Sequence, residues 1–475
     1  MVIHLRPYQR LALYHLRRSM EAGAWRQYLD LPTGTGKSTL AAAFAAQRLG
    51  QTPGRVLALV HRQGLALQLA ETFRQEELEV GLLMEGSHTL HTPVVVATVQ
   101  SLMPEATQAL LTADAMPILT VLIDEAHHAV PGSAYERVLA AIEQAAGAQP
   151  VAVIGLTATL YRNDERSMLS LLPVCAFART IPEMVQEGYL APLTWKPVQL
   201  DLDLAQVATS RETGERDYAE TALAAHLLRE AITARLVGHA ASLIGQRPTL
   251  VFAASVQHAA HLSSAFRARG LAAAPVSGRT SRKQRDELFA RWKDGAIQVV
   301  CNCALLTEGY DFPGIAALVI ARPTLSPALY MQMLGRGMRR AEGKTDCLVI
   351  DVLGKQPDAR RQVVLPHVIG IEAAPEDEGH AGKPLRSRSS DPVLRSILGG
   401  RGETGLALLD PLGRSPYRWT AYSRGYFARI NAHVIAILER DPAKSGLYRS
   451  RQYARQPERV PEHLWIEWRY LPLRQ

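Results

Sequence analysis

The stretch Leu31-Pro32-Thr33-Gly34-Thr35-Gly36-Lys37-Ser38-Thr39 decides how the first part of this 475-residue chain is interpreted. It holds the only lysine among the first 195 residues, where arginine is otherwise frequent. A compact ammonium fits beneath the β- and γ-phosphates of a nucleotide, whereas a planar guanidinium has the wrong shape. The two glycines leave backbone N–H groups free to face an anion, and the serine offers a hydroxyl to Mg²⁺. The stretch therefore predicts a nucleoside triphosphate site.

The residues after this loop favour the same interpretation. Residues 39–49 are rich in alanine and favour a helix, so the phosphates would lie at a helix N-terminus. The common pattern G-x-x-x-x-G-K-[ST] has one departure, because Leu31 stands at the position of its first glycine. A glycine-rich turn that binds no ligand is the alternative.

Length and composition bound the class of protein. The length allows about three domains, and a hydrophobic content of 47% is ample for packed cores. No apolar run approaches the roughly 18 residues that cross a bilayer, and residues 1–10 lack the apolar segment of a signal peptide. We therefore expect a soluble cytoplasmic protein with no membrane attachment. Cys301 and Cys303 are expected to share one face of a buried strand.

The net charge of +8 is concentrated towards the C-terminus. Residues 379–475 carry 17 Lys and Arg against 8 Asp and Glu, and also ten of the 29 aromatic residues. Arginine interleaved with aromatic rings suits a polyanion with stackable bases. A small basic domain whose rings form its own core is the alternative.

Short apolar runs rich in β-branched residues alternate with longer helix-like stretches along most of the chain. Runs that are apolar on both faces are what a parallel sheet covered by helices requires. Strands are predicted at 56–60, 94–98, 119–124 and 151–156, and again at 249–253, 298–300, 317–321 and 347–351. Amphipathic helices are predicted at 256–269, 282–293 and 327–340. The predicted fold class is α/β, with two tandem lobes.

Changes in this pattern give the predicted domain boundaries. The first lobe spans residues 1–195, and the second spans 196–355, beginning with a polar, irregular passage. A linker over 356–402 leads into a small basic and aromatic domain over 403–475. We expect that domain to be rich in β-strands, because aromatic and branched residues are mixed within it.

Chemically suggestive residues stand where the predicted strands end, which is the edge at which open parallel sheets bind ligands. Asp124 and Glu125 follow one strand, so one carboxylate can hold Mg²⁺ while the other orients and deprotonates a water molecule. Thr157 and Thr159 follow the next strand and can link the lobes by hydrogen bonding. The alternatives are a solvated acidic turn and a plain strand end.

The run Gln332-Met333-Leu334-Gly335-Arg336-Gly337-Met338-Arg339 is helix-like and places Gln332, Arg336 and Arg339 at helical spacing. Two arginines on one helix face could reach a γ-phosphate across a cleft. A basic, solvated helix face is the alternative.

As a set, these motifs resemble those of the superfamily 2 helicases of the DEAD/DEAH-box type. Arg6-Pro7-Tyr8-Gln9 looks like the Q motif. In the first lobe the resemblance extends to motif I (31–39), motif Ia (59–68), motif Ib (96–101), motif II (124–127) and motif III (157–159). In the second lobe it extends to motif IV (250–255), motif V (307–311) and motif VI (332–339). They follow the family order over roughly residues 1–355. The forms of motifs V and VI look most like the DNA-directed XPB and Ssl2 type, including bacterial and phage relatives.

The resemblance implies two RecA-like domains with one ATP and Mg²⁺ held between them. It implies nucleotide contacts from Arg6, Gln9, Thr33, Gly34, Thr35, Gly36, Lys37, Ser38, Thr39, Asp311 and Gln332, with Gln9 at the adenine and Asp311 at the ribose. Ser38 and Asp124 would hold Mg²⁺, Glu125 would hold the water, and Arg336 and Arg339 would close on the γ-phosphate. Nucleic-acid contacts are implied for Arg62, Thr98 and Thr307, and coupling between lobes for His127, Thr157 and Thr159.

The implied activity is ATP-driven movement along nucleic acid, with DNA favoured over RNA. An RNA helicase, a branch-migration motor, and an ATP-binding scaffold that does not move along a strand are the alternatives. A cleft within one chain requires no oligomer. Cys303 stands where relatives often have threonine, which removes one usual backbone contact. No large N-terminal damage-recognition domain is expected, because the Q-like motif begins at Arg6.

Overall fold

The computed structural model describes residues 4–113, 116–158, 168–210, 216–303, 312–355 and 362–368, and seven short strands after them. The chain divides into two compact units, Met1–Val363 and Val364–Gln475. In the described part of the chain, no helix combines the length and apolar character needed to cross a membrane.

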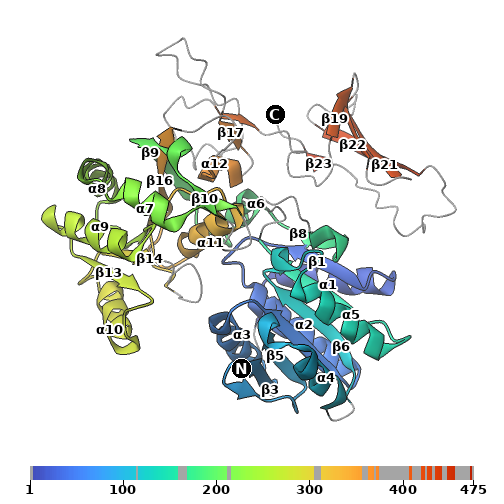
Figure 1. The fold of residues 1–475 in the computed structure, drawn as a ribbon. Helices are drawn as coiled ribbons and strands as arrows, with labels where there is room; N and C mark the ends of the chain where they lie inside the picture. Colours follow the sequence, from blue (N-terminus) through green and yellow to red (C-terminus); the bar gives the residue numbers. More distant parts are fainter. Residues whose placement is uncertain are drawn as a thin grey trace. The chain divides into compact units, whose positions relative to one another are not determined.

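The first lobe is built on an eight-stranded sheet flanked by helices (Figure 1). In spatial order its strands are β4 (Ser87–His88), β3 (Val80–Met84), β5 (Val94–Thr98), β2 (Arg55–Val60), β6 (Ile118–Asp124), β7 (Ala152–Thr157), β1 (Arg26–Asp30) and β8 (Val174–Ala178). The helices are α1 (Pro7–Glu21), α2 (Lys37–Gln51), α3 (Gln63–Gln75), α4 (Pro104–Thr112), α5 (Ala134–Ala146) and α6 (Ile181–Gln186). All neighbouring strands pair in parallel except β3 and β4. Every residue of the central strands β2 and β5 is buried, as a sheet covered on both faces requires.

The second lobe has a six-stranded sheet in which every neighbouring pair is parallel. Its strands in spatial order are β13 (Ala273–Ser277), β14 (Val299–Cys303), β12 (Thr249–Phe252), β15 (Ala317–Ile320), β16 (Cys347–Lys355) and β9 (Leu193–Asp203). Its helices are α7 (Glu220–Leu227), α8 (Glu230–Ile244), α9 (Val256–Ala268), α10 (Arg282–Lys293) and α11 (Pro327–Gly337), and a hairpin of β10 (Thr209–Ser210) and β11 (Asp217–Tyr218) precedes α7. Cys301 and Cys303 are both buried on β14, as predicted.

The predicted fold class is confirmed, because each of the eight predicted strands overlaps a strand of one of these two parallel sheets. Strand β9 crosses the predicted boundary between residues 195 and 196. Its burial alternates, with Val198, Leu200 and Leu202 inward and polar residues between them, so a search for wholly apolar runs misses it. The passage predicted to be irregular therefore begins with the end of a strand.

The second unit contains a five-stranded antiparallel sheet, in agreement with the β-rich expectation. Its strands are β19 (Trp419–Tyr422), β20 (Gly425–Arg429), β21 (Val434–Arg440), β22 (Leu447–Ala454) and β23 (Leu471–Pro472). A separate pair is formed by β17 (Ile371–Ala373) and β18 (Leu406–Leu408), and the short helix α12 (Leu365–Val368) precedes it.

Candidate active site

The loop between β1 and α2 has a backbone suited to an anion. Gly34 and Gly36 have φ values of +87° and +76°, a left-handed conformation that glycine adopts without steric cost. Gly36 is also the residue that precedes the first turn of α2, and it brings no side chain to cap that turn. Lys37, Ser38 and Thr39 form this first turn. Their N–H groups are therefore the natural partners of a phosphate.

Hydrogen bonds within the chain fix this loop. The Thr35 hydroxyl donates to the Pro32 carbonyl over 2.7 Å, and Lys37 Nζ donates to the Leu31 carbonyl over 3.2 Å. The Leu31 N–H donates to the Thr157 carbonyl over 2.9 Å, which joins the loop to the end of β7. The loop is thus preorganised by its own contacts.

The start of α1 also holds the loop. Gln9 is buried; its amide nitrogen donates to the carbonyls of Thr35 (3.3 Å) and Gly36 (3.2 Å), and its amide oxygen accepts from the Arg6 N–H (2.9 Å). The Tyr8 hydroxyl donates to the Thr35 carbonyl as well. Both ends of the Gln9 amide are therefore used within the chain, so its predicted contact with adenine stays a prediction. The role of Tyr8 was missed, although its place in the Q-like motif was a signal.

Asp124 and Glu125 lie at the end of β6. Burial raises the pKa of Asp124 to about 6; the charge of Glu125 adds to this effect, and Lys37 opposes it. The Glu125 N–H donates to Asp124 Oδ1 over 3.0 Å, and Glu125 itself has a φ of +49°, which is uncommon for a residue with a side chain. A crowded, half-buried pair of carboxylates beside a phosphate-type loop fits the oxygen ligands that Mg²⁺ prefers. The donor set is thus suited to Mg²⁺.

His127 contacts Glu125 and Thr157. It belongs to the short 3-10 helix η3 (Ala126–His128) and is buried. Its Nδ1 is 3.5 Å from Glu125 Oε2 and 3.4 Å from the Thr157 hydroxyl. Two of the three residues predicted to couple the lobes are therefore in contact, and the same Thr157 binds the start of the phosphate-type loop through its carbonyl.

A tyrosine that no motif in the sequence indicates lies near these carboxylates. Tyr135 on α5 is buried, and burial raises the pKa of its hydroxyl, with further contributions from Asp124 and Glu125. No spacing or motif connects it with them in the sequence, because they meet only in the folded sheet.

Within the unit Met1–Val363, the end of α11 meets the loop. A Cβ atom added to Gly34 would lie 3.4 Å from Cγ of Arg339, and one added to Gly335 would lie 2.2 Å from Cγ2 of Thr33. The Ala191 N–H donates to the Met338 carbonyl over 2.8 Å. The structure thus brings the predicted phosphate loop of one lobe against the predicted arginine segment of the other, with no room for an extra carbon at Gly335.

The prediction of a helix through residue 340 is wrong at its C-terminal end. Helix α11 ends at Gly337, so Arg339 lies beyond it and does not share a helix face with Arg336. Lys344 Nζ binds the Gly337 and Arg339 carbonyls over 2.6 and 2.8 Å, which satisfies them without a further helical turn. Gln332 and Arg336 are in the helix, and Arg336 is buried.

Arg62 and Thr98, two of the residues predicted to contact nucleic acid, lie in different elements of the first lobe. Arg62 is exposed at the start of α3, while Thr98 is buried at the end of β5 and its hydroxyl is 2.8 Å from the Ser101 hydroxyl. The Gln100 side chain donates to the His61 carbonyl over 3.0 Å and so joins the two segments. Thr159, Thr307 and Asp311 lie outside the described residues.

Comparison with known proteins gives two family matches, one in each lobe. Residues 2–162 match the family described as type III restriction enzyme, res subunit, and residues 233–341 match the helicase conserved C-terminal domain. Two of the solved structures that resemble this chain are from restriction enzymes. A type ISP restriction-modification enzyme, LlaBIII, bound to DNA has a TM-score of 0.55 at 18% identity, covering 76% of this chain and 28% of its own. A fragment assigned to the HsdR subunit of a type I restriction enzyme from Vibrio vulnificus has a TM-score of 0.53 at 22% identity, covering 74% and 65%.

Curated relatives carry helicase names. The Saccharomyces cerevisiae protein named as ATP-dependent helicase IRC3 is 29% identical over 78% of this chain and 54% of its own length. The Schizosaccharomyces pombe protein named as mitochondrial ATP-dependent helicase irc3 is 32% identical over 74% of this chain and 57% of its own length. The chain thus spans about half the length of these relatives. The chain belongs to the superfamily 2 helicases of the DEAD/DEAH type. The IRC3 proteins are among the curated relatives that the chain matches, and the XPB/Ssl2 likeness stays a prediction.

Proposed function

We propose that this chain hydrolyses ATP at the contact between its two lobes and uses the energy to move along DNA. The observation that carries the proposal is the contact of Gly34 with Arg339 and of Thr33 with Gly335, since it joins the loop suited to phosphate to a segment with two arginines. When a ligand bound by two lobes is cleaved, it no longer holds the lobes together, so their relative position can change.

The proposed roles rest on the resemblance to the helicase motifs and on the positions described above. Lys37 and the N–H groups of the first turn of α2 bind the phosphates. Ser38 and Asp124 would hold Mg²⁺, which neutralises charge on the phosphates when bound. Glu125 orients the attacking water and accepts its proton, and Arg336 and Arg339 stabilise the charge that develops on the γ-phosphate.

His127 and Thr157 are proposed to connect the reaction to movement. His127 lies against Glu125 and against the Thr157 hydroxyl, while the Thr157 carbonyl binds the start of the loop. A shift of Glu125 after hydrolysis would therefore move His127 and, through it, Thr157 at the end of β7. Arg62, Thr98 and Thr307 are the proposed contacts with the nucleic-acid backbone, and such contacts carry no sequence information.

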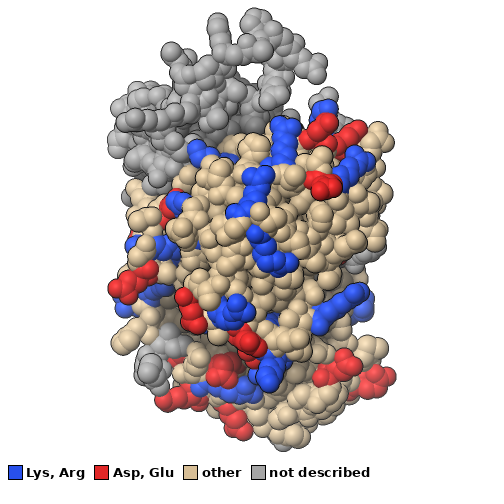
Figure 2. All heavy atoms as spheres, turned by 90° about the vertical axis from the view of Figure 1, so that its left-hand side faces the viewer, with Lys and Arg blue, Asp and Glu red and all other residues tan. Residues whose placement is uncertain are grey.

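One observation supports DNA rather than RNA as the proposed substrate. One solved relative of similar fold is described as bound to DNA. The excess of basic and aromatic residues over 379–475 adds electrostatic attraction for a nucleic-acid strand. In contrast, the face shown in Figure 2 has Lys and Arg interspersed with Asp and Glu over its coloured surface. We therefore propose that the basic C-terminal region contributes additional binding to the strand.

The test is ATP hydrolysis measured alone and with single-stranded DNA, duplex DNA, forked DNA and RNA. We expect stimulation by at least one DNA, because the bound strand orders the contact between the lobes. Glu125→Gln should lower the maximal rate by about a hundredfold or more while ATP still binds. The matched control is Glu79→Gln, an exposed residue of the same lobe, which should hydrolyse ATP normally. Stimulation by RNA alone would reassign the substrate, and an unchanged basal rate on all four would overturn the motor.

A further inference from the structure

Lys344 binds three backbone carbonyls, two in the segment that resembles motif VI and one just after the segment that resembles motif V. It follows the tight turn at Gly343, which has a φ of +72°, and it precedes β16. Its ammonium donates to the carbonyls of Gly337 (2.6 Å), Arg339 (2.8 Å) and Pro313 (3.2 Å). An ammonium has three donors, so these bonds use its full capacity.

The positions of the three carbonyls show which parts of the backbone the Lys344 ammonium joins. Gly337 is the last residue of α11, and a positive charge at a helix C-terminus is favourable. Arg339 is the arginine that meets the phosphate-type loop, so its own backbone is held by the same ammonium. Pro313 follows the segment 307–311 that resembles motif V, at the start of the next described stretch. One side chain therefore ties the end of motif VI to the residues just after motif V.

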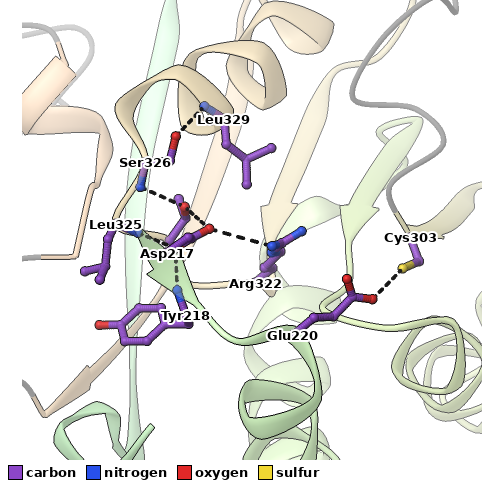
Figure 3. A network of polar contacts seen from close by, with 9 residues as sticks. Asp217, Tyr218, Glu220, Cys303, Arg322, Leu325, Ser326 and Leu329 are labelled. Atoms are coloured by element: carbon purple, nitrogen blue, oxygen red, sulfur yellow. Dashed lines mark hydrogen bonds and ion pairs between the residues drawn. The ribbon is translucent and has the colours of Figure 1, made fainter. Parts of the chain in front are cut away.

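The opposite end of α11 is held in another way. Asp217 accepts from the Leu325 N–H and from the Thr324 hydroxyl, each over 2.8 Å, and Ser326 caps the helix by accepting from the Leu329 N–H over 3.2 Å (Figure 3). These contacts fix where α11 starts. They do not reach Arg339, which lies past the last helical residue; its carbonyl accepts from Lys344, and the carbonyl of the preceding residue, Met338, accepts from the Ala191 N–H.

We propose that Lys344 is a positioning residue that holds the backbone of Arg339 so that this arginine reaches the γ-phosphate; the inference rests on the proposed function. Without the ammonium, the carbonyls of Gly337 and Arg339 must find other donors, and buried carbonyls that lose a partner drive local rearrangement. Lys344 itself does not contact the nucleotide. Its effect on the reaction passes through Arg339.

The experiment is a double-mutant cycle on the full chain, with maximal rate and KM for ATP measured in the presence of DNA. Lys344→Met, which keeps the length of the side chain and removes the ammonium, should lower the maximal rate between about tenfold and a hundredfold with KM changed less than about twofold. In an Arg339→Ala background the same substitution should add almost nothing, because the residue through which it acts is gone. Multiplied losses in the double variant would overturn the inference.

Two further variants test whether the loss of rate in Lys344→Met comes from the missing ammonium. Lys344→Arg retains the charge, should recover part of the rate, and replaces Lys344→Met in the cycle if that chain does not fold. Lys355→Met is the matched control, since Lys355 forms an exposed ion pair with Asp201 in the same lobe, and it should leave the rate unchanged. A wild-type chain without hydrolysis, or full activity in Arg339→Ala, would instead count against the proposed function.

A readout independent of activity completes the test. Amide hydrogen exchange over residues 336–345 should accelerate in Lys344→Met and remain at the wild-type rate in Lys355→Met. Unchanged exchange in Lys344→Met would show that the backbone of Arg339 is held by other contacts, and the inference would then be wrong.

Discussion

Replacing Gly335 with alanine adds one methyl group at the point where the two lobes touch. The new carbon would lie 2.2 Å from Cγ2 of Thr33 and 2.5 Å from its Cβ. Carbon atoms pack at about 3.5–4.0 Å, so the contact must open by about 1.5 Å. A misplacement of about 1 Å in a reacting group can cost a hundredfold in rate. We therefore expect the maximal rate of ATP hydrolysis to fall by about a hundredfold in Gly335→Ala.

The same substitution should not destabilise the second lobe by itself. Gly335 lies inside α11, where alanine is favoured over glycine by about 0.5–1 kcal/mol. The assay is steady-state ATP hydrolysis with DNA, together with the thermal unfolding midpoint of each variant. Thr33→Gly removes all three side-chain atoms that the methyl group would meet, so Gly335→Ala combined with Thr33→Gly should be about tenfold faster than Gly335→Ala alone.

Gly50 supplies the matched control, since it also lies in a helix but has open space around its Cβ position. Gly50→Ala should hydrolyse ATP at the wild-type rate. Wild-type turnover in Gly335→Ala would refute the reasoning, because it would mean that hydrolysis does not need the lobes in contact at Thr33.

Three other predictions concern binding, pH and salt. Lys37→Ala should abolish ATP binding in equilibrium titration, and wild-type affinity would remove Lys37 from the phosphate site. Burial, followed by the charge of His261, lowers the pKa of His258 from 6.5 to about 4. Because the folded state disfavours the charged form, the stability present above pH 6.5 should be lost as the pH falls towards 4, by about 3 kcal/mol. The unfolding midpoint of the wild type should then fall more over this range than that of His258→Phe, and parallel curves would contradict the burial argument. A chain truncated after Gly379 should bind DNA more weakly with a shallower salt dependence, whereas an unchanged slope would leave the C-terminal region without a role in the grip.

The parallel sheets could be predicted because their central strands are apolar on both faces. Residues 56–60 and 94–98 are buried throughout, and no other element produces such short, fully apolar runs between helices. The loop at 31–39 could be predicted because its glycines and lysine serve one chemical purpose. Edge strand β9 was missed because its outer face is polar, which hides it among irregular segments.

The remaining features depend on contacts between residues far apart in the chain. Gly337 is the one signal within residues 327–340 for the end of α11, and the bond from the Lys344 ammonium to its carbonyl is seen only in the fold. The same holds for Tyr135, which meets Asp124 only when α5 packs on the sheet. Gln9 was assigned to a ligand from its motif, but its bonds to Thr35 and Gly36 arise from the packing of α1 against the loop.

The most direct measurement of the central claim is the time that the chain takes to reach a fluorescent label at the end of a DNA strand. Single-stranded and duplex DNAs of increasing length are compared after ATP is added to preformed complexes. If ATP hydrolysis between the lobes drives movement, the arrival time grows linearly with length on at least one substrate, and Glu125→Gln gives no arrival signal. Arrival times that do not depend on length on any substrate, while ATP is being hydrolysed, would contradict it.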